Sequence, residues 1–180
     1  MIKWLKKIER EKLVQRRFDK TFDFMSETMP PPAKILDLGT PNSQGEFLKS
    51  KGYSIENTSG EDFDLKPQIV GTAGYDAVTA FEVLEHLVNP MGVLREITAP
   101  KLFASIPLSL WFSKAYRSKT DPWDRHFHEF EDWQFDWLLE KSGWRVIRRK
   151  KWTNPSIVPG IRPILRSFTP RYYAIEAERT

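Results

Sequence analysis

Short apolar runs alternate with segments of helical periodicity over most of the chain. The runs are rich in β-branched and small apolar residues, which predicts buried strands; they lie at residues 33–39, 53–57, 75–81 and 101–107. Apolar positions at helical spacing predict helices at residues 44–52, 89–97 and 131–143. Strands that alternate with helices indicate an α/β fold, with a mostly parallel sheet and helices on both faces.

The C-terminal part of the chain has a different pattern. Residues 144–152 and 171–179 are predicted to form two further strands, joined by a proline-rich loop over 153–170. Such a pair is expected to run antiparallel at one edge of the sheet. Between Asn57 and Gly74 the chain is too short for a full helix–strand–helix unit. The pattern leaves open whether "DFDL" in this segment is a strand or a loop.

A basic helix is expected at the N-terminus. Residues 2–28 alternate apolar and charged positions at helical spacing. The prolines at 30–32 end this helix, because proline cannot donate the helical hydrogen bond. We predict that residues 1–29 form a leading helix packed on a single domain of residues 30–180. The alternative is a helix that lies on an acidic membrane surface.

Bulk composition excludes several classes of protein. The chain has 180 residues, of which 40% are hydrophobic, and this is enough for one domain with a sizeable core. The absence of cysteine excludes disulfides and thiolate metal sites and fits a reducing compartment. No window approaches the roughly 18 apolar residues of a membrane span, and the charged N-terminus lacks the apolar core of a signal peptide. We therefore expect a cytoplasmic protein.

The net charge of +4 conceals a strong asymmetry. Residues 1–29 carry eight Lys and Arg against five Asp and Glu, residues 30–140 carry ten against seventeen, and residues 141–180 carry ten against two. An acidic middle between basic ends suggests that the ends meet phosphate, nucleic acid or an anionic lipid surface. The alternative is pairing of these charges within the protein.

Candidate binding residues lie where the predicted strands end. In an open parallel sheet, ligands bind beyond the carboxyl ends of the strands. Asp37 ends the first strand, and Gly39 allows a tight turn there. Glu56 follows nineteen residues after Asp37, a spacing suited to a carboxylate that accepts from ribose hydroxyls. This pattern alone would fit any nucleoside-binding fold.

The order of "ILDLG", "YSIEN" and "YDAVTAFEVLEHLVNPMGVLREI" resembles the class I S-adenosylmethionine-dependent methyltransferases. The "FEVLEHL" block, with "YD" before it and "NP" after it, is most similar to the branch that includes the ubiquinone-pathway O-methyltransferases. The resemblance runs from about Lys34 to the end of the chain. It implies a Rossmann-like, doubly wound, seven-stranded sheet, mostly parallel, with an antiparallel pair at its C-terminal edge.

The resemblance also implies that S-adenosylmethionine is the cofactor and gives each matching residue a role. Asp37, Gly39 and Thr40 would face the methionine part of this donor, and Glu56 would hold the ribose. Asp62 and Phe63 would lie beside the adenine, while Phe81 and Glu82 would line the floor. The family usually continues its first strand as Asp-x-Gly-x-Gly-x-Gly, whereas this chain has "DLGTPNSQG". Either this loop has another conformation that admits the donor, or donor binding is weak or lost.

"FEVLEH" also raises the question of a metal. If this segment is helical, Glu82, Glu85 and His86 share one face, and two carboxylates with an imidazole suit Mg²⁺, Mn²⁺ or zinc. A fourth ligand would come from His126 or His128; we take His128 as the candidate. Their segment, "WDRHFHEFEDWQF", loosely resembles that of the small-RNA 3′-terminal 2′-O-methyltransferases, which implies a metal that holds acceptor hydroxyls. The alternative is a structural, hydrogen-bonded histidine without metal.

The resemblance implies methyl transfer, for which alignment matters more than covalent help from the protein. His86 or His128 is the candidate general base if the acceptor must lose a proton. The aromatic segment 108–130 is expected to form an acceptor lid or, alternatively, to pack as an ordinary loop. The expected acceptor is a small molecule, lipid or sugar, methylated at oxygen or, alternatively, at nitrogen or carbon. The alternatives are a donor-free binding module or partner subunit, and an RNA 2′-O-methyltransferase.

Overall fold

The computed structural model describes residues 2–155 and 160–180, with side chains from Ile8 onward. Its sheet has six strands in the order β2-β1-β3-β4-β6-β5. The first four strands are mutually parallel, and β6 runs antiparallel to both β4 and β5. This confirms the mostly parallel sheet and the antiparallel C-terminal pair. The strands are β1 (Lys34–Asp37), β2 (Ser54–Asn57), β3 (Ala77–Phe81), β4 (Lys101–Pro107), β5 (Trp144–Thr153) and β6 (Pro170–Arg179).

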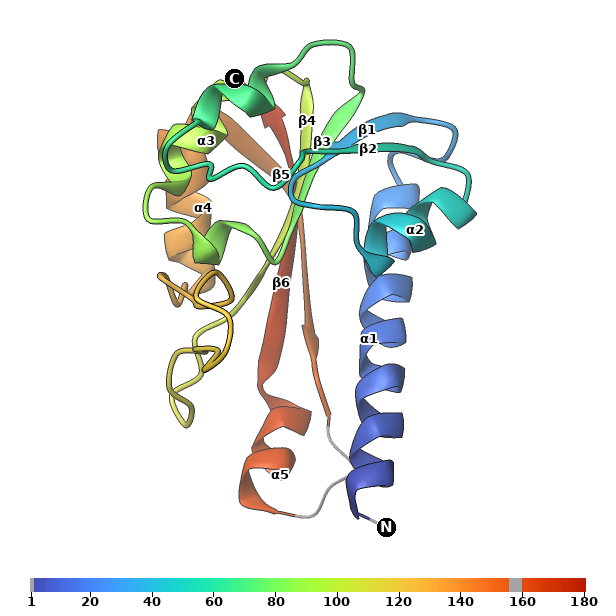
Figure 1. Cartoon of the computed structure of the whole chain (residues 1–180), viewed down its shortest axis with the longest axis vertical. Helices are drawn as coiled ribbons and strands as arrows, with labels where there is room; N and C mark the ends of the chain where they lie inside the picture. The colour runs from blue at the N-terminus through green and yellow to red at the C-terminus, as the bar shows by residue number, and fades with distance from the viewer. Residues whose placement is uncertain (1, 156–159) are drawn as a thin grey trace.

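Helices cover both faces of this sheet (Figure 1). The α-helices are α1 (Ile2–Ser26), α2 (Ser43–Ser50), α3 (Pro90–Glu96), α4 (Asp132–Lys141) and α5 (Ile161–Phe168), with short 3₁₀ helices η1 (Pro67–Gly71) and η2 (Leu84–His86). In Figure 1, α1 and α2 lie on one side of the sheet, and α3 and α4 lie on the other. Within the described residues, no helix is long and apolar enough to cross a lipid bilayer.

The expected seventh strand is not present in the described part of the chain, and this corrects the strand count. The segment between β2 and β3 forms turns and η1 instead. Phe63 and Val70 bury their side chains in the core, whereas Asp64 accepts hydrogen bonds from the backbone N–H groups of Val88 and Asn89. An aspartate side chain that accepts from backbone N–H groups in this way stabilises a loop rather than a strand.

A second correction concerns the predicted loop over 153–170, which contains helix α5 among its described residues. Pro163 lies within the first turn of this helix, where its missing N–H group has no helical partner to lose. Proline there is compatible with a helix, so the prediction that all of 153–170 is a loop was wrong. None of the residues of α5 is buried.

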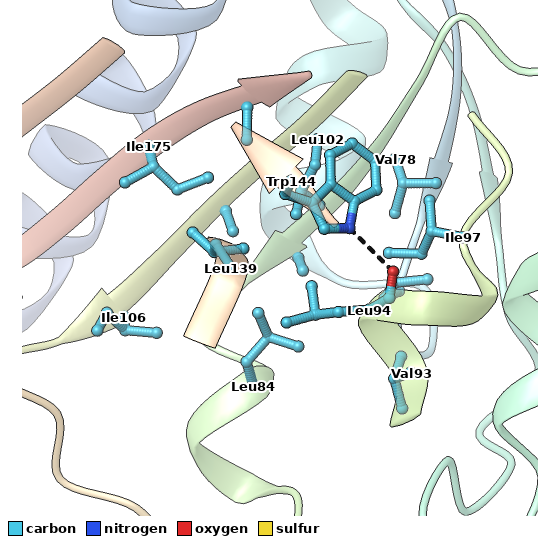
Figure 2. Packing of buried hydrophobic residues seen from close by; sticks show 14 of the residues in the cluster. Val78, Leu84, Val93, Leu94, Ile97, Leu102, Ile106, Leu139, Trp144 and Ile175 are labelled. Atoms are coloured by element: carbon cyan, nitrogen blue, oxygen red, sulfur yellow. Dashed lines mark hydrogen bonds between the residues drawn. The ribbon is translucent and has the colours of Figure 1, made fainter. Parts of the chain in front are cut away.

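Two hydrophobic clusters occupy the two faces of the sheet. Val78 and Leu102 pack in the larger cluster with residues of α3 and α4, and their neighbours Ala77 and Phe103 pack in the second cluster with Phe24 of α1 and others. This alternation follows from the two-residue period of strands. Figure 2 shows Trp144 in the larger cluster, where its indole Nε1–H donates to the carbonyl of Leu94 at 2.9 Å.

Replacing Trp144 by Phe tests how much this buried hydrogen bond stabilises the fold. The Leu94 carbonyl also accepts from Arg179, so the variant does not leave it unpaired. We expect the free energy of unfolding to fall by about 1–2 kcal/mol, for one hydrogen bond and part of an indole ring. Urea unfolding measures this loss, provided that the free energy of unfolding depends on urea concentration with the same slope in both proteins. Trp137→Phe is the control, because Trp137 is 55% exposed on α4 and its variant should stay within about 0.5 kcal/mol of the wild type.

Candidate functional site

The loop after β1 is built around the buried carboxylate of Asp37. One carboxylate oxygen accepts from the Thr79 hydroxyl at 2.6 Å. The other accepts from the side-chain amides of Asn57 at 3.1 Å and Asn42 at 3.3 Å. Burial raises the pKa of Asp37, and these three hydrogen bonds act in the opposite direction. The carboxylate therefore joins the ends of β1, β2 and β3 to the start of α2.

The loop "DLGTPNSQG" after β1 lacks the regular glycines of the Asp-x-Gly-x-Gly-x-Gly pattern, and side chains hold its conformation instead. Asn42 caps α2, accepting from the backbone N–H groups of Gln44 and Gly45. Gly39 adopts a φ of +109°, which glycine takes without strain. Its N–H donates to the Thr58 hydroxyl at 2.8 Å. Asparagine and threonine side chains thus hold the turn that a glycine-rich loop makes with its backbone.

A cleft of about 310 Å³ opens against this loop. Five of the predicted donor-binding residues line it: Asp37, Gly39, Thr40, Phe81 and Glu82. Helix α1 contributes Arg17 and Phe18 to the same cleft, and the sequence analysis did not assign these two residues to a site. The sequence does contain a signal for Arg17, which lies within the apolar stripe of a basic helix. A cation at such a position needs a polar environment.

Glu82 is held at the floor of the cleft in a strained backbone conformation. Its φ is +58°, which is uncommon for a residue other than glycine and recurs at functional sites. The Ser105 hydroxyl donates to its carboxylate at 3.0 Å, and Arg17 Nη1 lies 3.9 Å from the other carboxylate oxygen. Burial raises the pKa of Glu82, and the charge of Arg17 acts against this rise.

The helical turn expected over 82–86 is shorter than predicted. Only Leu84–His86 are helical, as the 3₁₀ helix η2, so Glu82 does not share a helical face with Glu85 and His86. Instead, Glu85, His86 and His126 each place a ligand atom so that these atoms lie within 4.8 Å of one another. Neither Glu82 nor His128 is in this group, and the expected four-residue ligand set stays a prediction.

Each imidazole of this group has an oxygen atom close to its Nδ1 atom. The Nδ1 atom of His86 lies 3.0 Å from the Arg125 carbonyl oxygen, and the Nδ1 atom of His126 lies 2.8 Å from Glu129 Oε1. In both imidazoles an oxygen atom therefore lies within hydrogen-bond distance of Nδ1, as is common for histidines that bind metals through Nε2. His86 Nε2 is 3.8 Å from the Glu85 carboxylate.

Glu85 is unusual because it is 1% exposed and both carboxylate oxygens lack a hydrogen-bond partner within the part of the chain that the structure describes. Burial, followed by the nearby charge of Glu82, raises its pKa well above the ordinary value. Burial also lowers the pKa of His86, and His126 lowers it further. Without a cation, Glu85 is thus favoured in its protonated form and His86 in its neutral form.

Other predicted residues lie away from the cleft. The carboxylate of Glu56 accepts from the Tyr75 hydroxyl at 2.6 Å and lies 3.1 Å from the ammonium of Lys34, and these contacts lower its pKa. Lys34 opens β1 and Tyr75 precedes β3, so Glu56 is directed toward the amino ends of the strands. Its neighbour Asn57 contacts Asp37 instead. A one-residue difference reverses the face of a strand, and spacing along the sequence cannot resolve it.

Three further residues have other surroundings. Phe63, 5% exposed, packs in the larger hydrophobic cluster. Asp62 accepts from the Asp64 N–H and lines a second cavity. His128 stacks on Phe130 with ring centroids 5.1 Å apart, and its Nε2 lies 3.3 Å from the Val88 carbonyl oxygen. The adenine-binding role of Asp62 and Phe63 and the catalytic role of His128 stay predictions.

The second cavity, of about 640 Å³, lies under the aromatic segment 108–130. His86 and His126 line it with the aromatic side chains of Tyr116, Trp123 and Phe127. The segment is tied to η2, because the backbone N–H groups of Phe127 and His128 both donate to the Glu85 carbonyl. This open, partly aromatic cavity with two imidazoles at its wall could accept a small organic ligand.

Comparison with known proteins gives a fold and not a closer relationship. No family model matches the sequence, and no curated protein matches it. Solved structures do match. The fold is that of the S-adenosylmethionine-dependent methyltransferases. One similar structure is the 1,6-didemethyltoxoflavin-N1-methyltransferase of Burkholderia thailandensis, with 1,6-didemethyltoxoflavin and S-adenosylhomocysteine bound. It has a TM-score of 0.64 at 13% identity, over 91% of this chain and 78% of that one.

Two further structures match over similar lengths. A SAM-dependent methyltransferase of Archaeoglobus fulgidus has a TM-score of 0.61 at 15% identity, over 95% of this chain and 94% of that one. Magnesium protoporphyrin IX methyltransferase of Synechocystis PCC 6803, with bound S-adenosylhomocysteine, has a TM-score of 0.56 at 11% identity, over 93% and 84% of the two chains. At these identities the comparison establishes the Rossmann-like methyltransferase fold alone, since one fold serves many functions.

Proposed function

We propose that this protein is an S-adenosylmethionine-dependent methyltransferase that transfers a methyl group to oxygen of a small-molecule or lipid-linked acceptor. One observation carries the proposal: the turn after β3 contributes to two cavities. Phe81, Glu82 and Val83 line the cleft against the β1 loop, and His86 lines the aromatic cavity. A donor in the first and an acceptor in the second would meet at this turn, and methyl transfer requires this alignment above all else.

The cleft has the charges that the donor needs. S-adenosylmethionine carries a carboxylate, an ammonium and a sulfonium. Arg17 is the cation that lines the cleft, and its guanidinium would pair with the donor carboxylate. Glu82 lies nearby and would favour the cationic sulfonium. The amino end of α2, capped by Asn42, adds a further preference for an anion at the same loop.

His86 would be the general base in the absence of a metal. Its lowered pKa keeps the imidazole neutral near neutral pH, as a proton acceptor requires. Its Nδ1, held by the Arg125 carbonyl, would carry the ring proton, which leaves Nε2 as the acceptor atom. The aromatic segment above it would exclude water from the acceptor.

A divalent ion such as Mg²⁺ or Mn²⁺ is the second part of this proposal. The donor set of one buried carboxylate and two imidazoles suits Mn²⁺ or zinc better than Mg²⁺, which prefers oxygen ligands, and the unpaired oxygens of Glu85 would gain a partner from such an ion. Glu85, His86 and His126 would hold the ion, and Glu129 would orient His126. The chemistry that such an ion supplies is a lowered pKa for an acceptor hydroxyl.

The RNA alternative requires free cations at the basic C-terminal end. On β5, however, Arg145 and Arg149 pair with Glu178 and Asp136, and Arg148 pairs with Glu176 and Glu27. Lys150 and Lys151 also lie beside carboxylates. Much of this charge is therefore neutralised within the protein, which leaves less of it to hold phosphates.

Calorimetric titration with S-adenosylhomocysteine tests the donor site. We expect the wild type to bind, and Arg17→Gln to bind about tenfold or more weakly, because the substitution removes a charge-assisted pair with the donor carboxylate. Arg16→Gln is the matched control, since Arg16 is the exposed neighbour on α1 and should leave the affinity unchanged. If the wild type shows neither heat nor a rise in melting temperature at saturating ligand, the donor-free binding module is the better interpretation.

A further inference from the structure

Helix α5 has an apolar face that the described structure leaves in solvent. Ile161, Ile164 and Phe168 recur at helical spacing and therefore lie on one side of this helix. Their exposed fractions are 79%, 61% and 81%. Apolar side chains scattered singly need no explanation, but three on one side of a short helix form a patch, and such patches mark interaction surfaces.

Trp111 is a further exposed aromatic side chain, on the segment that follows β4. The backbone N–H of Leu108 donates to the Arg171 carbonyl at 2.8 Å, so the chain leaving β4 runs beside the chain that joins α5 to β6. Trp111 and Phe168 each lie three residues from that hydrogen bond, and both are 81% exposed. Tryptophan is enriched where an apolar phase meets water.

The charges around α5 differ from those on β5. Arg162 and Arg166 lie on the helix next to its apolar face. Unlike the cations of β5, neither has a carboxylate partner among the residues that the structure describes. Two unpaired arginines beside an exposed apolar stripe are complementary to an anionic surface layer that covers an apolar interior. An anionic lipid bilayer has this arrangement.

We propose that α5 and Trp111 form a docking surface for an anionic lipid bilayer. The apolar side chains would enter the boundary between headgroups and acyl chains, and Arg162 and Arg166 would pair with the phosphate groups. Figure 1 places α5 at the end of the molecule where the N-terminal half of the basic helix α1 also lies. A groove beside α1 is lined by Arg10, Leu13, Arg17, Asn154 and Tyr172 among others, and Arg17 also lines the proposed donor cleft.

Docking of this kind narrows the acceptor class of the proposed function. An acceptor with an acyl or prenyl tail could keep the tail in the bilayer while its polar head entered the aromatic cavity beside His86. Docking itself needs no methyl donor. It is therefore measured in the absence of one, and its outcome does not depend on whether the protein transfers methyl groups.

Flotation of the full chain with lipid vesicles tests this proposal. We expect binding to vesicles of phosphatidylcholine mixed with phosphatidylglycerol, weak or no binding to phosphatidylcholine alone, and a decrease as salt is raised. Phe168→Ser and the double variant Arg162→Gln, Arg166→Gln should each weaken binding by at least about tenfold. Because no residue of α5 is buried, these variants should keep the melting temperature of the wild type.

Trp137→Ser is the matched control, since it removes an exposed tryptophan from α4 and should leave vesicle binding unchanged. Three results would overturn the proposal. These are equal binding to both vesicle types, binding that the α5 variants do not weaken, and self-association without vesicles that Phe168→Ser abolishes. The last result would assign the apolar face to contact with a second copy of this chain.

Discussion

Asp37→Ala is expected to weaken the binding of S-adenosylhomocysteine by at least about a hundredfold. The carboxylate is 4% exposed, so it acts mainly by holding other groups in place. Its removal leaves the Thr79 hydroxyl and the amides of Asn42 and Asn57 without their common acceptor. Each buried donor left unpaired costs about 1–3 kcal/mol, and the cap of α2 and the loop at Gly39 would lose their fixed position.

The same variant should also lower the free energy of unfolding, by about 2 kcal/mol, because neighbouring groups relax toward water and recover part of the loss. Titration calorimetry and urea unfolding measure the two effects separately. Asp76→Ala is the control. Asp76 accepts from the Lys34 N–H at the amino end of β1, whereas the cleft lies at the carboxyl ends of the strands. This variant should therefore leave ligand affinity unchanged. Wild-type affinity in the Asp37→Ala protein would contradict both the site and its proposed organisation.

The sequence was sufficient to predict the sheet and most helices, for a physical reason. Buried strands and amphipathic helices record their environment in the period of their apolar residues, as Val78 and Leu102 do on one face and Ala77 and Phe103 on the other. Helix ends are also recorded locally: Asn89 caps α3, and Gly52, with a φ of +101°, follows the end of α2.

Details that depend on contacts distant in sequence could not be predicted in this way. Arg17 reaches the cleft because α1 packs across the sheet, and no local pattern fixes that angle. His126 rather than His128 joins Glu85 because the segment 108–130 is tied to η2 by backbone hydrogen bonds. Helix α5 was not predicted. None of its residues is buried, so the helix is not stabilised by packing on the core.

Glu85 leads to an expected pH dependence of stability in the metal-free protein. Its pKa is raised in the folded state, so the folded protein keeps this proton at pH values where the unfolded chain, with an ordinary value of 4.5, has lost it. The folded state then binds more protons, and the free energy of unfolding falls as pH rises above that value, by up to about 1.4 kcal/mol per pH unit. The loss continues until pH reaches the folded pKa.

Replacing Glu85 by Gln should remove this contribution, because glutamine does not titrate. With a chelator present, we expect Glu85→Gln to be more stable than the wild type near neutral pH and to lose less stability as pH rises from 5 toward neutrality. Urea unfolding at a series of pH values measures both. Glu96→Gln, an exposed carboxylate on α3, is the control and should follow the wild-type curve. A wild-type slope in Glu85→Gln would mean that Glu85 is already ionised in the folded protein.

If Glu85 is a metal ligand, Mn²⁺ should stabilise the folded protein more as pH rises, which is opposite to the pH dependence expected without metal. A cation binds the ionised carboxylate and neutral imidazoles, so its affinity rises with pH and it stabilises the folded state through mass action. We expect Mn²⁺ to raise the melting temperature of the wild type, more at higher pH, and not to raise that of Glu85→Gln or His126→Gln. His128→Gln is the decisive control. It should keep the full response, because His128 lies outside the ligand group, and loss of the response there, or its survival in Glu85→Gln, would exclude the proposed metal site.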